Sequence, residues 1–403
     1  MRGIWHHGGV TITAEIAVVG LGAVGSAALY QAAKLGAKVI GIDRFSPPHD
    51  QGSSHGETRI TRQAIGEGRE FVPLVLRSNE IWEELETATG RKLLTRNGGL
   101  ILATPGLPGS HHGSRSFLQD TIDAARAFGI AHEQLSTDET RRRFPQFRVT
   151  EEAAYFEPGA GFLRPEACIE VQLAQARELG ARVFTSESVL EMKPANGGVE
   201  VRTNKATYSA GKVIVAAGPW IGKFLPPEHA SHFRVYRQTL CWFAVRQNQE
   251  RYSTDHFPVF IWITGTRVQD MLYGFPAIDG PEGGMKVATE RYEEMVDPDA
   301  VPREVSEESV AEMYSQYVDP RFPDLSNRCL RTATCLYTVT PDAKFVIDYA
   351  DGGQYVLFAS ACSGHGFKHS PAIGEALAQR ALGLPTTIDL SAFAMNRLTR
   401  SGC

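Results

Sequence analysis

The sequence predicts a mixed α/β (α+β) fold, in which a Rossmann-like domain is combined with a second domain built on a mainly antiparallel sheet with helices. Two observations favour this class. The chain opens with a short apolar strand, a glycine turn and an alanine-rich helix, which is typical of the first βαβ unit of a parallel sheet. Residues 232–290 are rich in β-branched and aromatic side chains, which favours antiparallel strands.

The first βαβ unit carries a dinucleotide-binding motif. Glu15–Gly20 is predicted as a strand, Ala23–Leu35 as a helix and Lys38–Ile42 as a second strand. The turn has the G-x-G-x-x-G spacing, and Asp43 closes the second strand, where an acid that binds a ribose is expected. A pyrophosphate at the helix N-terminus would meet unpaired N–H groups and the helix dipole. The predicted contacts are Gly20, Gly22, Ala23, Val24, Gly25 and Asp43. The motif alone leaves NAD, NADP and FAD open.

The later elements follow from apolar periodicity, caps and turn residues. Helices are predicted over Glu70–Glu86, after the capping box of Ser136 and Glu139, over Pro165–Leu179, at the end of the acidic stretch Asp297–Val318 and over Ala372–Ala381. Leu93–Thr104 is predicted as a hairpin, and further strands are expected at Val213–Ala216, Phe345–Ile347 and Tyr355–Ala359.

The segments that are typical of a cofactor-binding domain are separated by segments of another type, so each predicted domain is discontinuous in sequence. The FAD- or NAD-type domain is expected to combine residues 1–90, 150–220 and 325–403. The substrate domain is expected to combine residues 91–149 and 221–324.

Composition narrows the class of partner. With 403 residues, 42% apolar and 22% charged, the chain is an ordinary globular protein. A net charge of −5 gives no reason to expect nucleic acid or an anionic membrane. No apolar run has membrane-spanning length, and Met1–Ala14 lacks the apolar core of a signal peptide. The scattered cysteines form no CxxC pair, so we expect cytoplasmic thiols without a zinc site or other metal.

Blocks of sequence in order along the chain resemble the family of monomeric sarcosine oxidase and N-methyltryptophan oxidase, among the D-amino-acid-oxidase-like flavoproteins. The blocks are residues 52–62, 66–74, 273–276, 334–338 and 363–368. The resemblance implies that the dinucleotide is FAD, and that the helix after residue 368 points its positive end at the flavin. It adds as cofactor contacts Arg44, Ser54, His55, Arg59, Gly218, Trp220, Cys335, Gly364, His365, Gly366, Phe367 and Lys368.

The resemblance also implies that Cys335 forms a thioether to the 8α carbon of the flavin. The chemistry is sound, because a thiolate is a good nucleophile and the 8α position of oxidised flavin is electrophilic. The alternative is a buried structural cysteine, which we favour for the other cysteines.

Further roles are implied residue by residue. Arg62 and Lys368 would hold the substrate carboxylate, as a bidentate Arg and a point-charge Lys can do; each could instead be a surface cation. His55 and Arg59 would lie over the flavin ring, although a loop histidine and an Arg paired with a nearby Glu are alternatives. The loop they open is read as leading into a helix.

On the second domain, Lys286 would stabilise the negative charge that develops on O₂ beside the flavin, with a surface lysine as the alternative. Tyr273 would line the substrate pocket or pack in the core. Glu290 stands where the relatives carry a pocket histidine. It would recognise a cationic or hydroxyl group on the substrate, or face solvent.

The expected activity is oxidation of secondary (N-methyl) amino acids by FAD. The C–N bond becomes an imine that hydrolyses to amine and aldehyde, and O₂ becomes H₂O₂. Oxidation of a cyclic imino acid such as pipecolate or proline, and a non-catalytic flavin-binding subunit, are the alternatives. We expect a monomer or small homo-oligomer.

Overall fold

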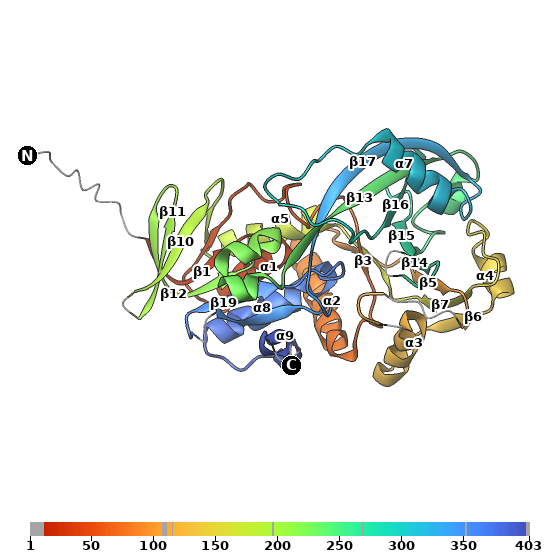
Figure 1. Ribbon diagram of the computed structural model, residues 1–403. Helices are drawn as coiled ribbons and strands as arrows, with labels where there is room; N and C mark the ends of the chain where they lie inside the picture. The colour runs from red at the N-terminus through yellow and green to blue at the C-terminus, as the bar shows by residue number, and fades with distance from the viewer. Residues whose placement is uncertain are drawn as a thin grey trace, which may run out of the picture.

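The computed structural model describes residues 12–106, 111–114, 116–195, 197–267, 270–350 and 353–399. Most of the leader Met1–Ala14, on which the expectation of no signal peptide rests, lies outside the described residues. Two large sheets dominate the molecule and lie on either side of it (Figure 1).

The first sheet has eight strands and carries the glycine turn. Apolar runs such as residues 213–215 are buried throughout, as expected of strands covered on both faces. Its parallel strands are β1 (Ile12–Val19), β2 (Val39–Ile42), β9 (Arg182–Phe184), β12 (Thr207–Val215) and β19 (Val356–Ser360). Antiparallel strands complete it: β10 (Val189–Ala195), β11 (Gly198–Thr203) and β18 (Val346–Tyr349).

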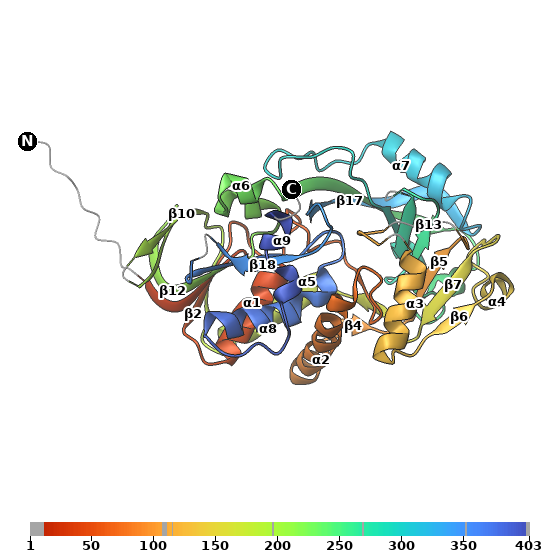
Figure 2. The same cartoon turned by 60° about the horizontal axis from the view of Figure 1, so that its bottom comes forward.

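Helices cover this sheet and fix the turn. Helix α1 (Ala23–Lys34) packs against α8 (Ser370–Ala381) and α5 (Pro165–Glu178), as Figure 2 shows. A Cβ added to Gly374 would lie 2.5 Å from Ala27 Cβ, so glycine is what lets α1 and α8 approach so closely. Helix α2 (Val72–Thr89) packs on α8 in turn.

The second sheet has eight strands in the order β17-β13-β16-β15-β14-β5-β7-β6. All its pairs are antiparallel except β5 with β14, which confirms the predicted architecture. Its strands are β5 (Gly99–Ala103), β6 (Glu133–Leu135), β7 (Ala153–Glu157), β13 (Arg234–Val245), β14 (Val259–Ile263), β15 (Met271–Phe275), β16 (Met285–Thr289) and β17 (Leu325–Val339).

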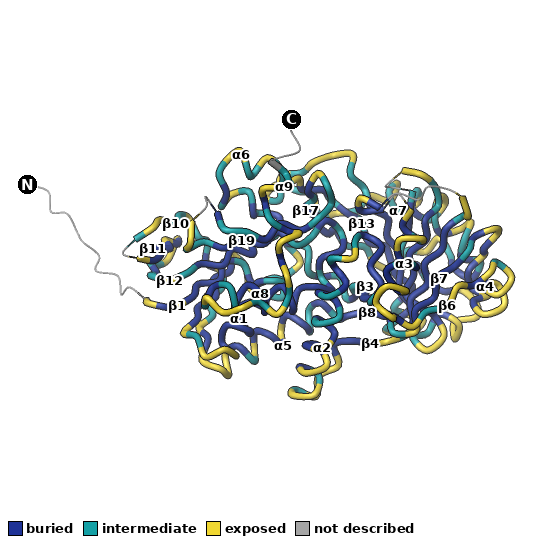
Figure 3. The backbone as a smooth tube through the Cα atoms, turned by 90° about the horizontal axis from the view of Figure 1, so that it is seen from below, coloured by how far each residue is buried: buried dark blue, intermediate teal, exposed yellow. Residues whose placement is uncertain are grey.

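Short elements complete the chain. A three-stranded sheet is formed by β3 (Arg59–Thr61), β8 (Gly161–Leu163) and β4 (Leu94–Thr95). The remaining α-helices are α3 (Phe117–Phe128), α4 (Thr137–Arg143), α6 (Pro227–Ala230), α7 (Glu307–Met313) and α9 (Asn396–Thr399). The capping box of Ser136 and Glu139 is present at the start of α4, as predicted. Figure 3 shows exposed residues gathered at peripheral helices such as α4 and α6, around a buried interior.

Two local predictions are wrong. Leu93–Thr104 is not a hairpin, because β4 pairs with β8 whereas β5 pairs with β7 and β14. The glycine turn between them is real, since Gly98 has φ +80, but its flanking strands find partners in two different sheets. The loop after His55 leads into strand β3 and not into a helix, because residues 59–61 pair with β8.

The predicted domain boundaries stay a prediction. Two strand pairings concern segments that were assigned to the cofactor domain. Strand β17 begins at Leu325 and pairs along β13, and β7 pairs with β5. Residues 325–339 and 153–157 therefore add strands to the sheet that was predicted for the second domain.

Among the residues that the structure describes, no helix has both the length and the apolar character needed to cross a membrane.

Candidate functional site

One elongated cavity of about 750 Å³ is lined from both large sheets. One end is formed by the glycine turn after β1, and the other by Tyr273 and Phe275 of β15 and Glu290 just after β16. Between them lies the loop 359–368 that leads into α8. Most residues of the predicted site lie on its wall, from segments far apart in sequence.

The dinucleotide end has the geometry of a tight turn. Gly20 has φ +86, and a Cβ there would lie 2.6 Å from Ala216 O. A Cβ on Gly25 would lie 1.7 Å from Gly20 O, so both positions require glycine. Gly22, Ala23 and Val24 line the cavity, and the first N–H groups of α1 have no acceptor within the helix. An anion placed there would satisfy them.

Asp43 lies on the cavity wall and orders the turn. Its carboxylate accepts hydrogen bonds from Leu21 N at 2.6 Å and from Phe45 N at 2.7 Å. Burial raises the pKa of Asp43 from its ordinary value. The side chain is thus held by backbone N–H groups beside the space where a ribose would lie.

A second acid, Asp299, organises the mouth of the cavity, and sequence reasoning missed it. It accepts from Trp220 Nε1 at 2.8 Å and pairs with Arg44 and Lys223. The Lys223 ammonium, with Trp220 and Arg44, holds the pKa of Asp299 below its usual range. Arg44 also lies over the ring of Trp220. The predicted contacts Arg44 and Trp220 are therefore brought together, and Gly218 lines the cavity beside them.

The residues present fit a bound flavin dinucleotide. In the loop before α8, Gly364 has φ +84, and a Cβ on Gly366 would lie 1.7 Å from Ala361 O. Among the described residues, the buried Ser53 Oγ, His55 Nε2 and Thr338 Oγ1 have no hydrogen-bond partner. Buried polar atoms are normally satisfied. Of these three residues Ser53 lines the cavity, so its Oγ is consistent with a bound group that the protein alone does not supply.

Cys335 lies behind the cavity wall. It is 1% exposed, and its Sγ lies 3.4 Å from the Arg59 guanidinium and 3.7 Å from Ser53 O. Cys335 does not line the cavity, but Ser53, Arg59 and Tyr337 around it do. Cys362, which we read as structural, does line the cavity. The structure thus presents two cysteines next to the space for the cofactor.

His55 lies in the loop that precedes Arg59 and strand β3, and it is buried. Burial and the positive charge of Arg59 lower the pKa of His55 to about 4. It is therefore a neutral imidazole at pH 7.

Lys286 is a buried cation held by three oxygens. Its Nζ donates to Gly56 O at 2.7 Å, and to Thr58 O and Thr58 Oγ1 at 3.1 Å each. The ammonium also lies 5.3 Å from the ring centre of Trp242 and 4.7 Å from that of Phe275. Burial, with the charge of Arg59, lowers the pKa of Lys286 well below its ordinary value. The surface-lysine alternative is therefore wrong.

Arg62 and Lys368 both line the cavity and are buried, so neither is a surface cation. Arg62 forms an ion pair with Glu67 at 2.5 Å and donates to Ala64 O. Although burial alone would raise the pKa of Glu67, Arg62 and His112 hold it well below its usual range. Lys368 Nζ donates to His365 O at 2.7 Å, and burial lowers its pKa to about 7.

Glu290 faces a histidine that the sequence did not single out. His112 Nε2 donates to Glu290 Oε2 at 2.6 Å, and Tyr292 OH donates to the same oxygen at 2.5 Å. Burial alone would lower the pKa of His112, but Glu290 raises it to about 9. Glu290 is 2% exposed, so it does not face solvent. Tyr273 completes this end of the cavity, with its OH 3.0 Å from Tyr337 OH.

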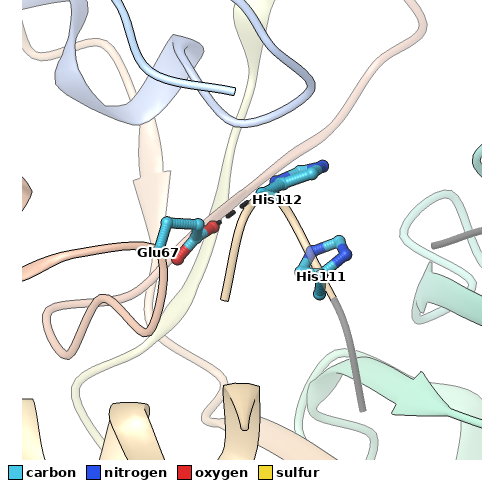
Figure 4. A group of neighbouring side chains, drawn as sticks. All are labelled: Glu67, His111 and His112. Carbon is cyan, nitrogen blue, oxygen red and sulfur yellow. Dashed lines mark ion pairs between the residues drawn. The ribbon is translucent and has the colours of Figure 1, made fainter. Parts of the chain in front are cut away.

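Glu67, His111 and His112 present ligand-type atoms within 4.8 Å of one another. In Figure 4, Glu67 and His112 point toward each other, with His112 Nδ1 3.7 Å from Glu67 Oε1. A metal ion there would meet the Arg62 guanidinium that already pairs with Glu67. The prediction that the chemistry needs no metal stays a prediction.

The residues that sequence reasoning missed fall into two groups. The partners of His112 and Tyr337, which are Glu290 and Tyr273, are remote in sequence, whereas Glu67 pairs with the nearby Arg62. A glutamate five residues after Arg62 was visible in the block 66–74; the role of His112 had no sequence signal.

Two known proteins are similar to this chain over nearly its whole length. A monomeric sarcosine oxidase of Streptomyces avermitilis is 36% identical over 388 residues, covering 96% of this chain and 98% of that protein. An N-methyl-L-tryptophan oxidase of Yersinia pestis is 34% identical over 387 residues, covering 95% and 99%.

Solved structures confirm the fold alone. A Tyr258Phe mutant of NikD, described as an unusual amino acid oxidase, matches with a TM-score of 0.81 at 23% identity, covering 95% of this chain and 97% of that one. L-proline dehydrogenase from P. horikoshii matches with a TM-score of 0.79 at 22% identity, covering 97% and 99%.

A family model described as FAD dependent oxidoreductase matches residues 15–380. The glycine turn, the cavity that joins both sheets and this match over most of the chain lead to one conclusion: the protein belongs to the FAD-dependent oxidoreductases of the D-amino-acid-oxidase type.

Proposed function

We propose that the protein is an FAD-dependent oxidase of secondary, N-methylated amino acids. The observation that carries the proposal is a pair of buried cations, Arg62 and Lys368, on the wall of a cavity that continues to the dinucleotide turn. Arg62 pairs with Glu67, whereas Lys368 donates to a backbone carbonyl, and a buried cation without full compensation is costly. A substrate carboxylate is the anion that would pair with them.

The charges of the side chains around the pocket favour an anionic ligand. Arg62 is balanced by Glu67, and His112 by Glu290. Lys368 donates only to a backbone carbonyl among the described residues. One positive charge is thus left over at neutral pH and below, which matches one carboxylate next to a neutral secondary amine.

The protein's own groups orient the substrate and exclude water. Arg62 and Lys368 fix the carboxylate, Tyr273 with Tyr337 forms the facing wall, and the C–H bond beside the amine is held toward the cofactor. Bound FAD would supply the acceptor for two electrons, with O₂ as the final oxidant. The sum is secondary amine plus O₂ plus water, giving primary amine, aldehyde and H₂O₂.

The cofactor assignments extend the proposal. Gly20, Gly22, Ala23 and Val24 would contact the pyrophosphate and Asp43 the ribose. Arg59, His55, Lys286 and Cys335 would surround the flavin ring. The free state of the five described cysteines supports a reducing, cytoplasmic setting.

The test is a peroxide assay of the purified chain with N-methyl amino acids, pipecolate and proline, together with anaerobic bleaching of the flavin. Oxidation of N-methyl amino acids is the expected result. Preference for the cyclic imino acids would replace the proposal with the cyclic alternative. No bleaching by either class would favour a non-catalytic flavin-binding subunit.

The pKa of Lys368 predicts a pH dependence of carboxylate binding. Burial lowers this pKa to about 7, so the ammonium is charged below pH 7 and is lost as the pH rises through 7. Affinity for methoxyacetate, a carboxylate with no titrating amine, should therefore fall above pH 7, by up to about tenfold per pH unit. In Lys368→Arg, whose guanidinium stays charged, affinity should be flat to pH 9.

Titration of the flavin absorbance with methoxyacetate from pH 6 to 9 measures this. An unchanged dissociation constant in the wild type, or the same slope in Lys368→Arg, would show that Lys368 does not bind the carboxylate.

A further inference from the structure

Glu290 offers one carboxylate oxygen to the cavity. Its Oε2 is used by His112 and Tyr292, at 2.6 and 2.5 Å. Its Oε1 accepts no hydrogen bond from the described residues. Glu290 is only 2% exposed, but it lines the cavity. A Cβ added to Gly364 would lie 3.0 Å from this oxygen. Oε1 therefore lies at the substrate end, against the loop that carries Lys368.

The surroundings of Glu290 decide what kind of group this oxygen suits. His112 is stacked on His111, with ring centres 3.8 Å apart, and its other nitrogen lies 3.7 Å from Glu67 Oε1. An imidazolium placed between two carboxylates keeps its proton, so Glu290 and His112 together carry no net charge. Lys368 adds a positive charge to the same cavity.

Two classes of substrate side chain are disfavoured by this arrangement. A cationic side chain would meet His112, Arg62 and Lys368 without a net negative charge in return. An aliphatic side chain would displace water from Glu290 Oε1 and leave a buried acceptor unsatisfied, which is costly. A neutral hydrogen-bond donor satisfies the oxygen at no cost in charge.

We infer that Glu290, held in place by His112 and Tyr292, is a specificity-determining residue that accepts a hydrogen bond from an uncharged donor, a hydroxyl or carboxamide, on the substrate side chain. The inference rests on the proposed function and narrows its substrate class. The carboxylate of the substrate pairs with Arg62 and Lys368, and its side chain extends to Glu290, which lines the same cavity.

Matched substrates test this subsite. N-methylserine and N-methyl-2-aminobutyrate differ only by a hydroxyl in place of a methyl group. A hydrogen bond to a charged acceptor predicts that the wild type favours the hydroxyl compound at least about tenfold in kcat/KM. N-methylhomoserine should likewise be preferred over N2-methyl-2,4-diaminobutyrate, whose side chain is cationic. Both enantiomers of each compound are assayed.

A binding measurement separates recognition from chemistry. 2-Methoxy-3-hydroxypropanoate and 2-methoxybutanoate carry an ether in place of the amine, so they cannot be oxidised to an imine. Their dissociation constants, from titration of the flavin absorbance, should show the same preference for the hydroxyl compound.

Variants of Glu290 complete the experiment. Glu290→Met removes the acceptor and should abolish the hydroxyl preference in both kcat/KM and binding. In Glu290→Gln the single amide oxygen still serves His112 and Tyr292, and the NH2 group takes the place of Oε1. A substrate hydroxyl can accept from this NH2 group, so the variant should retain a weakened preference and guards against loss of folding in the Met variant. Glu294→Gln removes a carboxylate from an exposed position and should keep the wild-type preference.

The results distinguish failure of the Glu290 subsite from failure of the proposed function. If N-methyl amino acids are oxidised but the hydroxyl and methyl compounds are equal, or Glu290→Met keeps their difference, the subsite is refuted and the oxidase stands. A preference for the cationic compound refutes the uncharged donor. If no N-methyl amino acid bleaches the flavin, the proposed function fails and the subsite with it.

Discussion

Lys286→Met should slow reoxidation of the reduced enzyme by O₂ by roughly 100- to 1000-fold, the loss typical when a preorganised charge is removed from a developing anion. Lys286 is buried and its Nζ donates to Gly56 O and Thr58 O, in the loop between Ser54 and Arg59, two residues that line the cavity, although Lys286 itself does not line it. Methionine has a similar unbranched stem and can occupy the slot between Trp242 and Phe275. Reduction by substrate, which does not need this charge, should change little.

Stopped-flow measurement of the two half-reactions decides the role of Lys286. Thr58→Val is the matched control, because it removes one hydrogen-bond acceptor of Lys286 and keeps the cation. It should affect reoxidation far less than Lys286→Met. Equal losses in both half-reactions of Lys286→Met would show that the lysine supports the fold of the site and not the reaction with oxygen.

Arg62→Gln should lower kcat/KM for N-methyl amino acids by at least about 30-fold, since loss of one partner of a buried charge pair costs about 2–5 kcal/mol or more. Two effects contribute. The substrate carboxylate loses a cationic partner, and Glu67, left without the Arg62 guanidinium at 2.5 Å, becomes a buried negative charge that attracts Lys368. The melting temperature should fall as well.

The double variant Arg62→Gln with Glu67→Gln separates these effects. Removing both charges should restore most of the melting temperature but not the activity, because the carboxylate still lacks its partner. If the double variant instead regains nearly wild-type kcat/KM, Arg62 serves only to neutralise Glu67, and the proposed carboxylate clamp is wrong.

Local signals explain how much of the molecule was predictable. The turn at Gly20–Gly25 and the loop at Gly364 could be predicted because backbone geometry there demands glycine. The capping box of Ser136 was equally local. The mistaken hairpin over Leu93–Thr104 had a genuine turn at Gly98, but strand pairing is decided by partners as remote as Val259, which no local pattern contains.

The same distinction between local and remote signals applies to the candidate site. Arg62, Lys368 and Cys335 could be found from short blocks of sequence, whereas their electrostatic setting could not. The pairing of Arg62 with Glu67 was within reach of the sequence, but the contact between His112 and Glu290 joins positions 178 residues apart. Only the fold brings that imidazole to that carboxylate.

The attachment of the flavin tests the account most directly, because the cavity, its cations and its cysteines are all interpreted around that ring. Acid precipitation of the purified protein, followed by peptide mass spectrometry, shows whether the chromophore is covalent and where. We predict that the yellow colour stays with the chain on the peptide of Cys335, and that Cys335→Ser releases it while Cys362→Ser does not. A chromophore that washes free while Cys335 is alkylated as an ordinary thiol, or one found on Cys362, would contradict the account.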